Sequence, residues 1–97
     1  MFPSMYSETK TPYEFFAEIH DFRLRHWKEY VGENLSWTGI TNEYLTNFSE
    51  HLQSRGVAPS AIKHCLLGIK KGLDDARLRG YRIGSKNYIN ILKQKQQ

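Results

Sequence analysis

Three basic residues recur at intervals of seven in the second half of the chain: Lys63, Lys70 and Arg77. An α-helix has about 3.6 residues per turn, so an interval of seven keeps all three side chains on one face. A row of cationic side chains suits the binding of a polyanion, because it matches a series of spaced negative charges. The row contains no nucleophile or general base, so it indicates binding and not catalysis.

The charge of the whole chain supports this interpretation. The net charge is +4, yet residues 1–50 carry four basic and eight acidic residues, whereas residues 51–97 carry ten basic and two acidic ones. A solvated helix face usually mixes the two signs, and here only Asp74 and Asp75 interrupt the basic run. A polyanionic partner is therefore favoured. The alternative is a solvated face held by pairs four residues apart, which the sequence permits for Lys70–Asp74, Lys71–Asp75 and Asp75–Arg79.

Other site chemistry finds little support in the sequence. One cysteine cannot form an internal disulfide, and four scattered histidines do not have the spacing of a structural zinc site. Cys65 lies within an apolar helix pattern, which favours a buried thiol over a nucleophile. His20 and Asp21 are adjacent, so on a helix they would not face each other. We therefore predict no catalytic residue, no cofactor and no metal, and we expect a chain that fits a reducing cytoplasm.

Two helices must position the basic row. Thr41 precedes apolar residues at helical spacing and predicts a helix over 41–54 that ends at Arg55-Gly56. Pro59 suits the first position of a second helix, over 59–79, which Gly80 closes. The apolar positions are Leu45, Phe48 and Leu52 in the first helix and Ile62, Leu66, Ile69, Leu73 and Ala76 in the second.

The second helix also carries a ridge of small residues at steps of three and four: Ala61, Cys65, Gly68, Gly72 and Ala76. Two glycines inside a helix cost about 1 kcal/mol each relative to alanine, so close approach of another backbone is expected to offset them. If the ridge is exposed, it predicts a different function: a helical protein–protein interaction module that docks a partner helix.

The rest of the chain has weaker signals. Residues 1–10 predict a flexible tail in which Phe2, Met5 and Tyr6 are the large apolar members. Thr11-Pro12-Tyr13-Glu14 is a capping box that opens a helix over 12–31, with an apolar face that includes Phe22. Trp37 is expected to anchor a loop in the core. Residues 84–97 predict a linker or a short helix near 86–94, capped by Ser85.

The hairpin over residues 40–82 resembles part of the N-terminal, core-binding domain of tyrosine recombinases, the phage-integrase family. The match consists of apolar positions and turns and covers a little under half of the chain. It departs from the family at Ala58 and Ala61, where hydroxyl residues are usual and where Ser60 could partly substitute. The matching residues are Ile40, Thr41, Leu45, Phe48, Leu52, Arg55, Gly56, Pro59, Ile62, Leu66, Ile69, Ala76 and Gly80.

This resemblance implies an all-α, SAM-like bundle of three to four helices over residues 11–83, followed by a connection toward a catalytic domain that these residues do not contain. The implied function is non-catalytic binding of double-stranded DNA at a recombination core site of a mobile element, in a cytoplasmic, nucleoid-associated protein. The implied partners are the catalytic domain of the same parent chain and other recombinase protomers assembled on DNA. No membrane partner is expected. The implied DNA-binding residues are Ser60, Lys63, His64, Lys70, Lys71, Arg77, Arg79, Arg82 and Lys86.

Overall fold

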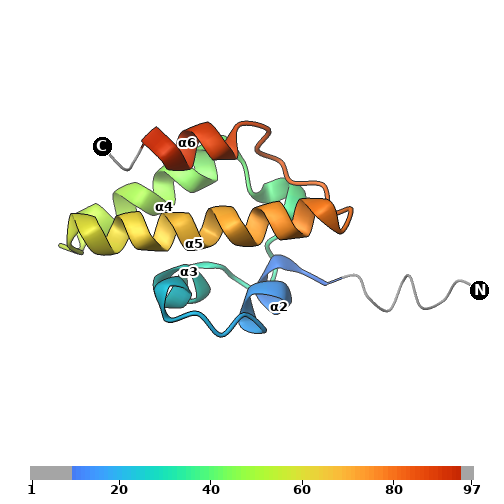
Figure 1. Cartoon of the computed structure of the whole chain (residues 1–97), viewed down its shortest axis with the longest axis horizontal. Coiled ribbons are helices and arrows are strands. Elements are labelled where there is room, and N and C mark those ends of the chain that lie inside the picture. The colour runs from blue at the N-terminus through green and yellow to red at the C-terminus, as the bar shows by residue number, and fades with distance from the viewer. Residues whose placement is uncertain (1–9, 95–97) are drawn as a thin grey trace, which may run out of the picture.

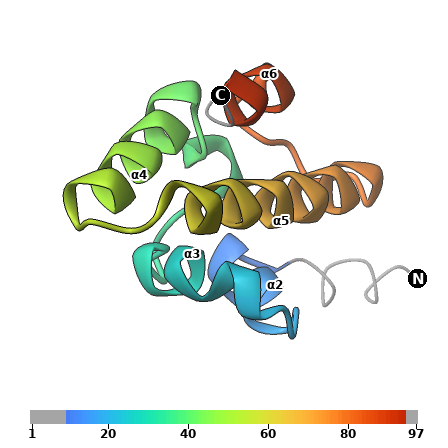
Figure 2. The same ribbon diagram turned by 60° about the vertical axis from the view of Figure 1, so that its left-hand side comes forward.

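The computed structural model describes residues 10–94, which form an all-α fold without strands. The longest helix, α5 (Pro59–Leu78), runs through the middle of the molecule (Figure 1). Helices α4 (Asn42–Ser54) and α6 (Tyr88–Gln94) lie on one side of it, and α2 (Pro12–Ala17) and α3 (Arg25–Tyr30) lie on the other (Figure 2). The all-α prediction is confirmed. The described residues contain five α-helices rather than three or four, because the first predicted helix is divided.

The hairpin of α4 and α5 forms where its local signals predict it. The Thr41 hydroxyl accepts a hydrogen bond from the backbone N–H of Tyr44 at 3.1 Å and so caps α4. Gly56 ends α4 with a φ of +80°, a left-handed conformation that favours glycine. Pro59 occupies the first turn of α5, and Gly80 follows the helix with a φ of +99°. Both predicted helices are confirmed to within a residue at each end.

The single helix predicted over 12–31 is wrong. The capping box at Thr11 does open α2, but this helix ends at Ala17, and Asp21 then caps a short 3-10 turn, η1 (Phe22–Leu24), before α3 begins. Leu24 lies nine residues after Phe15, so on one straight helix their side chains would point in opposite directions, about 180° apart. The break lets both side chains enter the core, where Phe15 is 7% and Leu24 1% exposed. Burial of both overrides the helical pattern.

Phe22, predicted as part of the apolar face, is instead 77% exposed. It lies on η1 two residues before the buried Leu24. The 3-10 turn that directs Leu24 into the core therefore leaves Phe22 outside it.

An aromatic cluster connects the N-terminal helices to the rest of the core. Trp27 makes edge-to-face contacts with Phe16 and Phe48, with ring centroids 5.5 and 5.1 Å apart. Trp37 is 9% exposed and stacks on Tyr81 at 4.6 Å, which confirms its predicted role as a core anchor. Its Nε1 donates to the Lys10 carbonyl at 2.6 Å. Of the predicted tail, Lys10 is thus bound to the domain, whereas Phe2, Met5 and Tyr6 lie outside the described residues.

The small ridge of α5 faces the N-terminal segment. A Cβ built on Gly68 would lie 3.0 Å from Cδ2 of Leu24, and a Cβ on Gly72 would lie 2.5 Å from Cε1 of Phe16. The ridge is therefore a packing surface, as the glycines predict. Ala61 is the exposed exception. Because the other four ridge residues are buried by side chains of this chain, the premise of an exposed ridge for a partner helix is wrong.

The C-terminal segment is built into the same core. Tyr88 and Leu92 of α6 are 2% and 1% exposed, so a short packed helix occupies the described part of the predicted linker. Residues 95–97 of that predicted linker lie outside the described residues. Before α6, the N–H groups of Gly84 and Ser85 donate to the carbonyls of Trp37 and Ile40 at 3.0 and 2.7 Å. The prediction that Ser85 caps α6 is wrong, because α6 begins three residues later, at Tyr88. Ser85 is buried, and its hydroxyl donates to Oδ1 of Asn42 at the start of α4.

Candidate nucleic-acid interface

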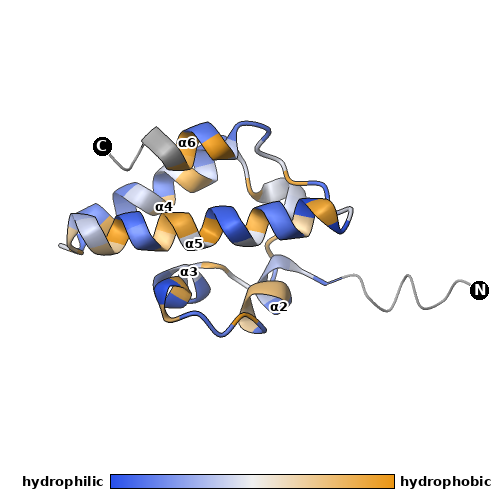
Figure 3. Ribbon diagram, in the orientation of Figure 1, coloured by the Kyte–Doolittle hydropathy of each residue, from blue (hydrophilic) through white to orange (hydrophobic). Residues whose placement is uncertain are grey.

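The solvent-facing side of α5 presents most of the basic residues that the sequence singled out. Lys63, Lys71 and Arg77 are exposed there, and Lys70 is half-buried. Hydrophilic segments recur along the whole length of this helix (Figure 3). The remaining predicted residues are all exposed: Ser60 and His64 on α5, Arg79 at its C-cap, and Arg82 and Lys86 in the connection to α6.

Ion pairs divide the cations of α5 into two groups. Lys70 pairs with Asp74 and Arg79 pairs with Asp75, each at 3.2 Å, as the solvated-face alternative permits. The Lys71–Asp75 pair that the sequence also permits is not formed among residues 10–94, where Asp75 pairs with Arg79. Within residues 10–94, Lys63, Lys71 and Arg77 have no carboxylate within ion-pair distance. These three side chains therefore keep their charge available to an external anion.

Asp74 links the basic face to α6. One of its carboxylate oxygens accepts a hydrogen bond from the Tyr88 hydroxyl at 2.5 Å, and the other accepts from Lys70 at 3.2 Å. Burial alone would raise the pKa of Asp74, but these two hydrogen bonds outweigh burial and lower it. For Tyr88, burial and the Asp74 charge raise the pKa to about 12. Lys70 is thus the most constrained cation of the row.

The structure adds two basic residues that sequence reasoning did not include, Arg23 of η1 and Arg25 of α3. The Cβ of Arg23 lies 3.9 Å from the position of a Cβ on Gly68, so η1 rests directly on α5. The hydrogen bond from Arg23 lowers the pKa of Asp21 to about 2, and the charge of Lys71 contributes to this shift. The turn η1, which carries Arg23 and belongs to the net acidic segment 1–50, therefore lies beside α5. The glycine at position 68 was the sequence signal for such an approach.

The candidate nucleophile Cys65 and possible metal ligands were the other chemistry that the sequence raised. Burial raises the pKa of the Cys65 thiol to about 11, and the hydrogen bond with the Trp27 backbone only partly offsets this effect. The thiol is therefore protonated near neutral pH, as expected for a structural cysteine. Over residues 10–94, no group of three or more His, Cys, Asp or Glu side chains could hold a metal ion.

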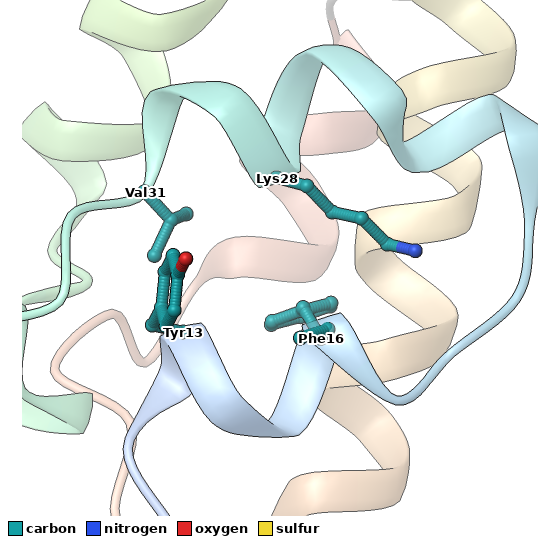
Figure 4. A pocket seen from close by; sticks show the side chains of 5 residues that line it. Tyr13, Phe16, Lys28 and Val31 are labelled. Carbon is teal, nitrogen blue, oxygen red and sulfur yellow. The ribbon is translucent and has the colours of Figure 1, made fainter.

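A small apolar hollow of about 240 Å³ lies between α2 and α3. Tyr13 points across it toward Val31, with Phe16 at its base and Lys28 along its edge (Figure 4). The Lys28 ammonium donates to the Ile19 carbonyl at 2.5 Å, so the only cation of the lining is already engaged. The hollow lies on the flank opposite α4 and α6.

The chain matches no protein-family model, and neither curated proteins nor solved structures show a significant similarity to it. In the part of the chain that the structure describes, no helix has the length and apolar character needed to cross a bilayer.

Proposed function

We propose that this chain is a non-catalytic, duplex DNA-binding domain that contacts the phosphate backbone through the solvent-facing side of α5 and the connection to α6. The observation that carries the proposal is the set of exposed cations on one rigid helix, in which Lys63, Lys71 and Arg77 have no carboxylate partner within residues 10–94. Contacts of this type supply affinity and position but little sequence readout.

Two further features support a phosphate partner. The helix that carries the cations is buried along its opposite side, so a bound backbone would meet a preformed and rigid surface. The flanking Arg82 and Lys86 extend the positive charge beyond the end of α5 without an ion pair that the structure records. A phosphate backbone is a line of charges, and a line of cations is its complement.

The parent activity follows from the recombinase resemblance of the α4–α5 hairpin. We propose that the domain grips DNA at a recombination core site together with a separate catalytic domain, which would supply the tyrosine nucleophile. The tyrosines of residues 10–94 would then be packing or surface residues, as the burial of Tyr88, the stacking of Tyr81 on Trp37 and the exposure of Tyr13 favour.

The experiment that tests DNA binding is a titration of a random duplex at two salt concentrations. Replacement of Lys63, Lys70 and Arg77 together by alanine is expected to remove most of the affinity. It should also reduce the slope of log K against log salt by about 2 to 3, since each phosphate contact contributes about 0.9.

The matched control keeps the charge and changes the side chains: Lys63→Arg, Lys70→Arg and Arg77→Lys. This variant should retain affinity close to wild type if phosphate contact is electrostatic. Circular dichroism checks that both variants remain helical. Equal duplex affinity for the alanine variant and the wild type would overturn the assignment of this face.

A further inference from the structure

Phe22 is an exposed aromatic side chain on the short turn η1. Its ring is 77% exposed, although it is an apolar residue in a domain whose other phenylalanines are buried over the described range. The guanidinium of Arg25 lies over the ring, 4.7 Å from its centroid. Such a cation–π contact orients the ring from one face and leaves the opposite face to solvent.

The turn that carries Phe22 is held firmly. The Asp21 carboxylate caps it by accepting from the backbone N–H and the side chain of Arg23, with the shortest contact at 2.7 Å. Leu24, two residues after Phe22, is 1% exposed and packs against Gly68 of α5. Phe22 therefore projects from a turn that is fixed on both sides, so little conformational freedom is lost when its ring is covered.

The surroundings of the ring are basic. Arg25 is exposed beside it, and the charge of Lys71 on α5 acts on Asp21 at the base of the turn. The Asp21 carboxylate is itself neutralised by Arg23. The exposed ring thus stands at the edge of the cationic face proposed to hold phosphates, where a base of the same nucleic acid would be within reach.

We infer that Phe22, oriented by Arg25, is a stacking platform for an unpaired nucleobase at the edge of the bound duplex. This inference rests on the proposed DNA-binding function. Intercalation between two paired bases would use both faces of the ring, but Arg25 occupies one of them. A single open face fits one base that has left the stack, which binds by base–aromatic stacking without sequence preference.

The test compares two short duplexes with the same flanking sequence, one fully paired and one with a single extrahelical 2-aminopurine. Wild-type protein should bind the second duplex more tightly and quench its fluorescence. Phe22→Ala should weaken binding to the bulged duplex about tenfold and leave the paired duplex unchanged. Phe22→Leu, which keeps apolar volume but no ring, should behave like Phe22→Ala, and Phe22→Tyr should restore both affinity and quenching.

The outcomes distinguish a failure of the stacking inference from a failure of the proposed DNA-binding function. If wild-type protein binds both duplexes equally, or if Phe22→Ala weakens both to the same extent, the stacking role is overturned while DNA binding stands. If wild-type protein binds neither duplex, both proposals are overturned. Because Phe22 is exposed, its variants should keep the wild-type circular-dichroism signal, which confirms that any change arises at the surface.

Discussion

The two flanks of α5 are held in the fold by different means. On the flank of α4 and α6, the connection before α6 is bonded to the segment before α4 through the backbone: the N–H groups of Gly84 and Ser85 donate to the carbonyls of Trp37 and Ile40. Side-chain hydrogen bonds reinforce this attachment at Ser85 and Tyr88. On the flank of α2, η1 and α3, apolar side chains rest on glycines of α5, and the Nε1 of the buried Trp27 has no hydrogen-bond partner among residues 10–94.

This difference determines how each flank responds to change. A backbone attachment has one geometry and little means of adjustment, whereas a side chain can move to another rotamer at a modest cost. We therefore expect substitutions at the backbone contact to be the most harmful. Those at the side-chain contacts should vary with how freely the opposing side chain can move.

The largest effect is expected for Gly84→Ala. A Cβ at this position would lie 2.0 Å from the carbonyl oxygen of Thr38 and 2.8 Å from its carbonyl carbon, so the two segments would have to separate. We expect the free energy of unfolding to fall by about 3 kcal/mol, the upper end for overpacking. Denaturant unfolding measures this loss of free energy. Gly32→Ala is the control, because a Cβ there meets no atom within 4 Å. Equal midpoints for the two variants would contradict the close approach.

On the other flank, Gly72→Ala is expected to destabilise the domain by about 2 kcal/mol. The new Cβ would lie 2.5 Å from Cε1 of Phe16, whose ring is 1% exposed and confined by Trp27. Gly68→Ala is the matched control. Its closest contact would be with Cδ2 of Leu24 at 3.0 Å, and its contacts with Leu24 Cγ and Arg23 Cβ would be of ordinary length, 3.4 and 3.9 Å. The gain in helix propensity, about 1 kcal/mol, should cancel most of the cost. Thermal melts of the two variants measure the loss of stability in each. Similar losses would mean that the Phe16 side chain is as free to move as the Leu24 side chain.

The smallest effect is expected for Tyr88→Phe, which removes the hydrogen bond to Asp74 and keeps the ring. At neutral pH the loss should be about 1 kcal/mol. Because the pKa of Tyr88 is raised from 10.0 to about 12 in the folded state, its contribution is complete below pH 10 and is lost as the pH rises toward 12. Stability curves from pH 8 to pH 12 should therefore converge for the variant and the wild type.

Tyr13→Phe is the control for this measurement, because the Tyr13 side chain is exposed. It should leave the alkaline dependence unchanged. A constant gap between wild type and Tyr88→Phe up to pH 12 would show that the hydroxyl of Tyr88 does not stabilise the fold through Asp74.

The same distinction explains what the sequence could predict. The α4–α5 hairpin is governed by local signals, namely the Thr41 cap, the left-handed Gly56 and Gly80, and Pro59 and the apolar positions between them. Its helices were therefore predicted to within a residue at each end. The glycine ridge was likewise predicted as a packing surface. What covers it was not predictable, because Phe16 and Leu24 reach α5 only after the chain breaks between α2 and η1.

The candidate interface shows the same division. The exposure of the basic residues on α5 follows from helical periodicity, and the Lys70–Asp74 and Asp75–Arg79 pairs follow from a spacing of four. In contrast, Arg23 and Arg25 are more than 35 residues from Lys63 in sequence, and only the packing of η1 on Gly68 brings them to α5. Likewise, nothing local to Gly84 indicated that the Thr38 carbonyl would lie against it.

The brevity of α2 and α3 has a consequence for local opening. Each has six residues, whereas isolated helices shorter than about 12 to 15 residues are marginal in water. Helices α2 and α3 therefore stay folded only while Phe16 and Leu24 remain packed against α5. Their amide protons should exchange with solvent through a partial opening that leaves α4, α5 and α6 together, so their protection would report the docking of this flank and not the global free energy of unfolding.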